Sequence, residues 1–586
     1  MLSNKLLTVS LACIFLWLTS FGQISNLTPY EKSGCKETPR YDQTMAFCRQ
    51  LKAASPLLKM ESIGKSPQGR DIPLLIVDRN RNFTPAAVRK SGNIVLLIQA
   101  CIHAGEPDGK DAGLMLLRDM LINGQHKELL DHVTLLFIPI FNVDGHERFG
   151  PYNRINQNGP NEMGWRTTAQ NLNLNRDYLK ADAPEMQSWL KNTSQWNPDF
   201  FIDCHVTDGA DYQYKLTYSL ELAGNIEAGL TNWTRDYYEK NLLSLLDADN
   251  TPAFSYVEFR NWHDPRSGLF VSPAPPMISQ GYFAVRNRPG LLIETHMLKD
   301  YKTRVEATYK TVLHTMELLN RDHPNFLQLC KNADLYTSSA EFRSKAFPIK
   351  FRTSSKDSVF VNFKGVEYES TKSDITGGNW FIYHPDKPVT MKIPLFSKAI
   401  PDITVKLPEA YVIPVEWTEV IKRIHLHGIK SYAITKPTAF TIQCYRFKNV
   451  SHQNISFEGH VSTSFNLDTV TMKREYPVGT VIVPMNQPLA RVAAYLLEPL
   501  ADGSLASWGF FDAVMEQKEY TESYVMERIA REMLSKDPNL QNEFEQKKNT
   551  DPIFAKNPQA IINWFYSKSP WWDSQLNLYP VGRILK

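Results

Sequence analysis

A histidine and a glutamate three residues apart give the first sign of chemistry in this sequence. His103 and Glu106 flank Gly105, a residue that lets the backbone turn so that both side chains can face one point. Imidazole and carboxylate groups both bind zinc, and a catalytic zinc takes three protein ligands and leaves a fourth position for water. Because a lone His-x-x-Glu pair is more often a surface pair or a helix-start signal, a third ligand is needed to support a metal site.

Other residues of catalytic type follow short apolar runs. Residues 94–102 lead to His103, 133–141 to Asn142, 200–204 to His205 and 290–293 to Glu294. Solidly apolar runs of this length are typical of strands buried on both faces. In an open parallel sheet, ligands bind at the carboxyl ends of the strands. We therefore expect His103, His205 and Glu294 to lie at one edge of a single sheet.

The order of these residues resembles that of the M14-type zinc carboxypeptidases, over about residues 40–320. The resemblance implies that His103, Glu106 and His205 hold one zinc ion. It also implies that Glu294 is the general base, which takes a proton from the zinc-bound water and passes it to the leaving amine. Burial on an apolar strand would raise the pKa of this carboxyl group toward the useful range. The alternative for Glu294 is a structural salt bridge.

Further segments resemble the parts of the family that contact the substrate. Arg166 stands in a Trp-Arg-Thr segment similar to the one whose arginine stabilises charge on the carbonyl oxygen. Asn175 and Arg176 resemble the pair that binds a terminal carboxylate, a role that suits the planar guanidinium fork. The segment Asn142-Val-Asp-Gly resembles a recurring loop of the family. The resemblance therefore implies a peptide substrate with a free C-terminus.

Two features depart from the family's pattern. Asn173 stands where the family often has an aspartate that orients the first zinc histidine, so that ring would meet an uncharged acceptor. The mobile tyrosine that binds substrate has no clear counterpart: Tyr282 is the first candidate and Tyr256 the second, although both are common packing residues. The segment Asp264-Pro-Arg266 either faces the substrate side chain or forms a solvated loop.

The elements that position these residues change in type along the chain. Residues 23–325 alternate apolar runs with amphipathic stretches, ending in a helical pattern at 301–321. This predicts an α/β catalytic domain with a mixed, largely parallel sheet flanked by helices. Residues 345–475 predict a β-sandwich-like accessory domain, and 476–586 a mixed α/β C-terminal region with helices near 521–535 and 557–568. The part after the catalytic domain is therefore expected to be β-rich.

Composition limits the classes of function. The chain has 586 residues, of which 42% are hydrophobic and 22% charged, so it is long enough for several folded domains and is not of the disordered type. Its formal net charge of +3 is too small to favour nucleic acid as a partner.

The N-terminus has the pattern of a signal peptide. Lys5 precedes an apolar run that ends near Leu18, and small residues follow up to Gly22, which predicts cleavage of residues 1–22. We expect export to the periplasm or the outside, soluble rather than lipidated at Cys13, with no stable membrane insertion after cleavage. Six cysteines remain, and Cys35 with Cys48 is the local pair to test as a disulfide.

Three functions are compared. The first is a zinc metallocarboxypeptidase that releases C-terminal residues from extracytoplasmic peptides. The second is a zinc amidase that acts on acyl-amino acids or peptidoglycan peptides, for which Arg176 would be dispensable. The third is a binding or scaffold protein with a vestigial catalytic domain. Because the chain retains all three expected zinc ligands and the glutamate, the first function is favoured.

Overall fold

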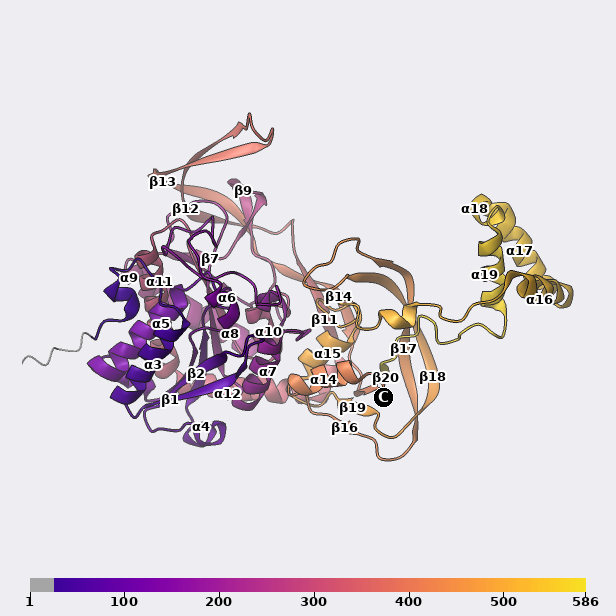
Figure 1. The fold of residues 1–586 in the computed structure, drawn as a ribbon, viewed down its shortest axis with the longest axis horizontal. Helices are drawn as coiled ribbons and strands as arrows, with labels where there is room; N and C mark the ends of the chain where they lie inside the picture. The colour runs from indigo at the N-terminus through magenta and orange to yellow at the C-terminus, as the bar shows by residue number, and fades with distance from the viewer. Residues whose placement is uncertain (1–25, 586) are drawn as a thin grey trace, which may run out of the picture. The chain divides into compact units, whose positions relative to one another are not determined.

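The computed structural model describes residues 26–585, so the predicted signal peptide lies outside the described residues. The chain forms two compact units, which are coloured by residue number in Figure 1. The first unit takes in the chain up to Glu409 together with Thr418–Tyr432 and Val483–Ser504. The second consists of Ala410–Trp417, Ala433–Ile482 and the chain from Leu505 onward. All the candidate metal ligands and catalytic residues predicted from the sequence belong to the first unit.

An eight-stranded sheet forms the centre of the first unit, in the order β1-β2-β4-β3-β5-β10-β6-β7. The strands are β1 (Leu58–Lys65), β2 (Asp71–Val77), β3 (Ile94–Gln99), β4 (Val133–Ile138), β5 (Phe200–Val206), β6 (Leu216–Leu220), β7 (Ala253–Ser255) and β10 (Gly290–Thr295). The neighbours β4, β3, β5 and β10 run parallel, whereas β1, β2 and β6 add antiparallel pairs. Every residue of β3, β4 and β5 is buried, as their apolar runs require. The predicted mixed, largely parallel sheet is confirmed.

Helices flank this sheet in the first unit (Figure 1). They are α2 (Pro29–Lys32), α3 (Tyr41–Ala54), α4 (Pro85–Ser91), α5 (Asp108–Arg118), α6 (Val143–Glu147), α7 (Pro184–Trp196), α8 (Ala228–Trp233), α9 (Lys240–Ala248), α10 (Ser279–Val285), α11 (Tyr301–Arg321), α12 (His323–Ser338), α13 (Ala340–Ser344), α14 (Thr418–Leu426) and α15 (Ala490–Leu497). The helix predicted for 301–321 is α11, and it packs on α5, which begins directly after the His103–Glu106 segment.

The β-rich part of the chain begins inside the first unit. There β11 (Ala346–Thr353) pairs with β14 (Ala399–Lys406), and the hairpin of β12 (Val359–Lys372) and β13 (Asn379–Phe396) joins β9 (Asp264–Phe270) and β8 (Glu258–Asn261) in a four-stranded sheet. Because β13 pairs with β9, strands from 345–409 share a hydrophobic core with the catalytic region, in which Phe363 of β12 packs with Tyr212. The range 345–475, predicted as one accessory domain, is thus divided between the two units.

The second unit contains its own sheet and helices. Its strands β15 (Ala410–Ile413), β20 (Gly582–Ile584), β17 (Thr438–His452) and β18 (Thr463–Tyr476) lie side by side in that order, over a core that includes Val412, Ile442 and Tyr476. Its helices are α16 (Ser523–Lys536), α17 (Pro538–Thr550), α18 (Pro552–Ala555) and α19 (Pro558–Lys568), packed around Met526 and Phe565. The remaining strands are β16 (Tyr432–Ala433) and β19 (Val481–Pro484).

Two predictions about the described residues can be compared with this structure. The cysteines at 35, 48, 101, 204, 330 and 444 are all unpaired, so Cys35 and Cys48 do not form a disulfide here. None of the helices between residues 26 and 585 has the length and apolar character needed to span a bilayer.

Candidate active site

The ends of three parallel strands bring the predicted residues together. His103 follows β3 by four residues, His205 lies near the end of β5, and Glu294 lies near the end of β10. Since β5 pairs with both β3 and β10 in parallel, all three residues stand at the same edge of the sheet. The edge predicted from the apolar runs is confirmed.

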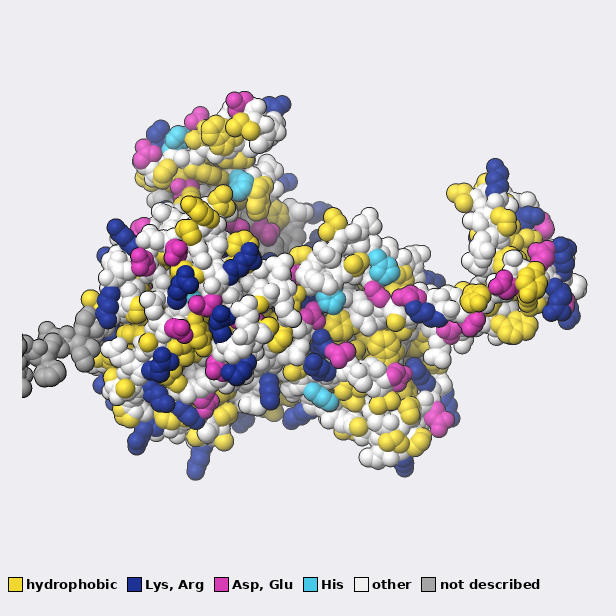
Figure 2. Space-filling model, viewed as in Figure 1, with side chains coloured by type: hydrophobic (Ala, Val, Ile, Leu, Met, Phe, Trp, Pro, Cys, Tyr) yellow, Lys and Arg dark blue, Asp and Glu magenta, His cyan; other side chains and the backbone are white. Residues whose placement is uncertain are grey.

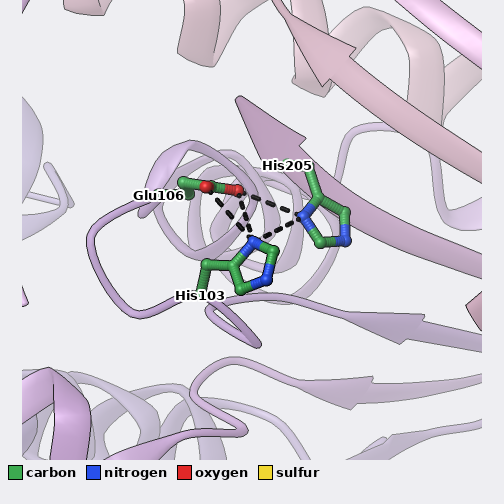
Figure 3. Close-up of side chains that lie close together, drawn as sticks. All are labelled: His103, Glu106 and His205. Carbon is green, nitrogen blue, oxygen red and sulfur yellow. Dashed lines mark hydrogen bonds and ion pairs between the residues drawn. The ribbon is translucent and has the colours of Figure 1, made fainter. Parts of the chain in front are cut away.

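Three ligand atoms from His103, Glu106 and His205 form a tight group (Figure 3). The Nδ1 atom of His205 lies 3.2 Å from Nδ1 of His103 and 3.1 Å from Oε2 of Glu106. The remaining separation, between His103 Nδ1 and Glu106 Oε2, is 3.3 Å. Tetrahedral zinc with nitrogen and oxygen ligands at about 2.0–2.1 Å places its ligand atoms about 3.3 Å apart. The donor set and its spacing therefore fit one zinc ion.

The outer nitrogens of both histidines meet oxygen atoms, which leaves Nδ1 on the metal side. His103 Nε2 lies 3.1 Å from Asn173 Oδ1, and His205 Nε2 lies 2.9 Å from Asp203 Oδ2. Gln99 in turn donates to the other oxygen of Asp203 at 3.0 Å. The uncharged partner expected at His103 is present, and a charged partner, which the sequence reasoning missed, stands behind His205. The signal for it was an aspartate two residues before His205 on the same face of a buried strand.

The protonation states of this group follow from burial and from neighbouring charges. Burial lowers the pKa of His103 to about 4, although Glu106 acts against it. Burial would raise the pKa of Glu106, but Arg154 and His103 outweigh it and hold that pKa well below the ordinary value. Burial acts to lower the pKa of His205, yet Asp203 outweighs it and raises that pKa well above the ordinary value. Neutral His103 and ionised Glu106 are ready to bind a metal, whereas His205 must release a proton.

Arg154 is a residue of this site that the sequence reasoning missed. Its guanidinium lies 2.9 Å from Oε1 of Glu106, and its side chain is only 15% exposed. The stem of Arg154 packs on Gly105, where an added Cβ would lie 2.7 Å from Arg154 Cγ. Gly105 therefore permits a close approach between the metal-ligand turn and the loop that bears Arg154. Arg166, at 3.6 Å from the same Glu106 oxygen, is less buried.

Glu294 lies directly opposite His205 in the parallel pairing of β10 with β5. Burial raises the pKa of Glu294 to about 8, against the opposing effect of His205 and with a further rise from Glu106. The carboxyl group lines the cavity described next. A carboxyl group of this basicity beside a metal site is suited to take a proton near neutral pH.

A cavity of about 520 Å³ joins the metal ligands to the predicted substrate residues. Arg166, Asn175 and Arg176 line it, together with Glu294. Asn175 is held at two points: its side-chain Oδ1 accepts from the Ser279 N–H at 3.1 Å, and its backbone carbonyl accepts from the Arg176 guanidinium at 2.7 Å. The predicted substrate-binding residues and the metal ligands therefore line the same cavity.

The prediction for Tyr282 is wrong, because this tyrosine is fully buried and does not line the cavity. Its ring packs near Tyr178 and Trp189, and its hydroxyl lies 2.7 Å from His427 Nδ1. Tyr256, the second candidate, does line the cavity. Burial, followed by the negative charge of Glu294, raises the pKa of Tyr256, so its hydroxyl keeps its proton and can donate it to a hydrogen bond.

Comparisons with known proteins agree with this geometry. The family model for zinc carboxypeptidases, Peptidase M14, matches residues 44–219, a range that holds the three metal ligands but not Glu294. Carboxypeptidase 2 from Trichophyton rubrum is 23% identical over 486 residues, which cover 80% of this chain and 84% of the relative.

Solved structures that are similar include two carboxypeptidases. The metallo-carboxypeptidase from Pseudomonas aeruginosa has a TM-score of 0.36 at 16% identity and covers 49% of this chain and 69% of its own. Carboxypeptidase A from Helicoverpa armigera has a TM-score of 0.36 at 14% identity, and the match covers 51% of this chain and 75% of the Helicoverpa chain. The family match and the curated relatives together carry the assignment: the chain has a zinc carboxypeptidase domain of the M14 family and is a zinc metallocarboxypeptidase.

Proposed function

We propose that this enzyme releases C-terminal residues from extracytoplasmic peptides, with one zinc ion held by His103, Glu106 and His205. The observation that carries the proposal is the spacing of 3.1–3.3 Å among the three ligand atoms, in the same cavity as Glu294 and Arg176. Zinc bound there would polarise the scissile carbonyl and lower the pKa of a water molecule. The rest of the chemistry falls to the protein's own side chains.

Glu294 is the proposed general base. Its position opposite His205 puts its carboxylate beside the metal ligands, where it would accept a proton from the attacking water and deliver it to the leaving amine. Its pKa, raised by burial to about 8, makes it a stronger base than an exposed glutamate. A cation held by the three ligands beside Glu294 would act in the opposite direction and would favour the ionised carboxylate at neutral pH.

Arg166 is the proposed donor to the carbonyl oxygen. It lies 3.6 Å from the metal ligand Glu106 and is 40% exposed toward the cavity side, so its charge is available next to the reacting bond. A cationic donor placed where negative charge develops stabilises the transition state more than the ground state.

Asn175 and Arg176 are the proposed binding group for the substrate's terminal carboxylate. Both line the cavity, and the Asn175 side chain is fixed by the Ser279 N–H. A guanidinium can hold a carboxylate through two parallel hydrogen bonds, which gives orientation as well as affinity. We assign to Tyr256, in place of Tyr282, the remaining hydrogen bond to substrate.

The alternative within zinc chemistry is an amidase that acts on acyl-amino acids or peptidoglycan peptides. Such an enzyme would not need the chain-end carboxylate, so Arg176 would be dispensable. The name carboxypeptidase on the curated relatives supports the first form. The signal-peptide pattern of residues 1–22 supports action in the periplasm or outside the cell.

The test uses the full chain with its zinc content measured. We expect about one zinc per chain and loss of peptide cleavage in Glu294→Gln with zinc retained, because removing a general base leaves the ligands intact. The matched control is Glu306→Gln, at an exposed position of α11. Full activity of Glu294→Gln would contradict the role of the base, and loss of zinc in that variant would make the residue a structural support of the metal site.

A further inference from the structure

A second cavity, of about 650 Å³, lies on the four-stranded sheet of β8, β9, β12 and β13. Its lining residues are Asn261, Trp262, His263, Asp264, Arg266, Tyr368, Ser370, Asn379 and Phe381. It shares no lining residue with the catalytic cavity. Asp264 and Arg266, expected either to face the substrate side chain or to lie in a solvated loop, are part of β9 and line this second cavity.

One wall of the second cavity is aromatic and open to solvent. Trp262 stands in the two-residue turn between β8 and β9 and is 65% exposed. Its ring lies 4.8 Å from that of His263, which in turn lies 6.1 Å from the ring of Phe381. Hydrophobic side chains also gather on the β12–β13 hairpin in the space-filling view (Figure 2). A large flat apolar surface exposed beside a cavity is a feature of binding sites.

The charged groups of this cavity are already compensated. Tyr368 donates its hydroxyl hydrogen to Asp264, and Arg266 pairs with Glu367 at 2.7 Å while its guanidinium lies 4.3 Å from the Tyr368 ring centre. A phosphate or carboxylate ligand would compete with Glu367 for the Arg266 guanidinium. The cavity therefore favours an uncharged ligand.

Uncharged hydrogen-bonding groups remain free in the same cavity. Among the described residues, no side-chain hydrogen bond is made by Asn261, Ser370 or Asn379. Two amides and a hydroxyl offer both donors and acceptors to a ligand rich in hydroxyl groups.

We propose that this cavity binds a neutral carbohydrate. A sugar ring presents a flat C–H face, which suits the exposed Trp262 ring, and a rim of hydroxyls, which suits the free amides. Peptides are often recognised through charged termini or charged side chains, and in this cavity Asp264 and Arg266 already have partners within the protein. The compensated charges and the free amides point to the same ligand class.

The position of the cavity connects it to the reaction, a connection that rests on the function proposed above. Glu258, at the start of β8, lines the catalytic cavity, and Asn261, at its end, lines the second one. Three residues of strand span about 10 Å. A sugar linked to a peptide substrate would therefore be held close to the catalytic cavity, so the substrate class becomes glycosylated peptides.

Direct binding tests the site without any need for activity. The full chain is titrated by calorimetry with the β-1,4-linked tetramers of glucose and of N-acetylglucosamine and with a mannose tetramer. We expect at least one to bind and Trp262→Ala to weaken it about tenfold or more, as loss of an aromatic stacking surface does. The matched control is Trp380→Ala, which removes a tryptophan of similar exposure, 56%, on β13 that does not line the cavity. It should change binding less than about twofold.

Three results would overturn the proposal. They are no binding of any of the tetramers, equal binding by wild-type and Trp262→Ala protein, or an unglycosylated peptide that binds instead with the same dependence on Trp262. Thermal unfolding of both variants shows whether they remain folded.

A kinetic comparison tests the connection to catalysis. For a peptide that carries the bound sugar, Trp262→Ala should raise KM about tenfold at unchanged kcat, while the bare peptide is cleaved equally by both forms. Equal KM for both substrates in the wild type would remove the link to substrate and leave the direct binding result standing. Failure to cleave the bare peptide would count against the proposed function and not against the sugar site.

Discussion

Glu294 lies directly opposite His205 in the parallel pairing of β10 with β5. The proposed base and a proposed metal ligand therefore lie on adjacent, hydrogen-bonded buried strands. Their relative position is set by the strand pairing and not by a loop. Strand pairing of this kind holds side chains more rigidly than a loop does, which favours a preorganised site.

The three-ligand group should account for all tight zinc binding. His205→Ala removes one of the three donors, so we expect zinc to be lost on dialysis and peptide cleavage to fall by several orders of magnitude. Zinc content by elemental analysis checks this, with His425→Ala at an exposed position of α14 as the control. Full zinc content in His205→Ala would show that the metal is held elsewhere.

The residues behind the two zinc histidines should affect zinc affinity through their charge. Removing the charge behind His205 and adding one behind His103 should therefore have opposite effects. Asp203→Asn keeps the shape but removes the charge behind His205, so zinc should bind about 10–100-fold more weakly. Asn173→Asp adds the charge missing behind His103 and should strengthen binding by about tenfold. Competition with a chelator measures both. Unchanged affinity in the two variants would mean that these oxygens do not affect the ligands.

Gly105 should tolerate no side chain. A Cβ there would lie 2.7 Å from Arg154 Cγ and 2.8 Å from the Gly164 carbonyl oxygen, so Gly105→Ala must move the loop that bears Arg154. We expect a loss of about 1–3 kcal/mol in the free energy of unfolding, with lower activity. Gly150→Ala, where a Cβ meets nothing closer than 3.8 Å, is the control. Denaturant unfolding of the two variants compares them, and equal stability would contradict the close approach.

Glu221, which accepts from the N–H of the cavity-lining residue Ala274, should make the stability of the protein depend on pH. It is buried, it accepts from the N–H groups of Ala223 and Ala274, and burial raises its pKa from 4.5 to about 7 despite these bonds. Because the folded protein binds this proton more tightly than the unfolded chain, the associated stability is present below about pH 4.5 and is lost as pH rises through 7.

The Glu221→Gln variant tests this dependence. It should unfold with a free energy that changes less between pH 5 and pH 8 than that of the wild type, by up to about 3 kcal/mol. Denaturant titrations at both pH values supply the measurement. If the free energy of unfolding of the wild type rose relative to that of the variant between pH 5 and pH 8, the predicted pH dependence of Glu221 would be contradicted.

How far the sequence predicts the site depends on where each residue lies. His103, His205 and Glu294 could be placed because each follows or ends a buried apolar run, and parallel strands end at a common edge. Arg154 could not, since it lies in a loop whose contact with Glu106 depends on the close packing over Gly105. Loop conformations of this kind leave no periodic pattern in the sequence.

The tyrosine and the domain prediction failed for similar reasons. Tyr282 and Tyr256 have the same chemistry, and only the tertiary structure shows that the first is in the core and the second at the cavity. The strands after residue 345 were correctly expected, but β13 pairs with β9, more than a hundred residues earlier in the chain. Alternation of apolar and polar residues predicts a strand and says nothing about its partner.

The most direct test is the dependence of cleavage on the substrate's free carboxylate. The ratio of kcat/KM for a peptide acid to that for its C-terminal amide is measured in wild-type, Arg176→Ala and Arg176→Lys protein. We expect the wild type to favour the acid by at least about a hundredfold, Arg176→Ala to lose that preference and Arg176→Lys to keep part of it. Equal cleavage of acid and amide by the wild type would contradict the proposed exopeptidase function.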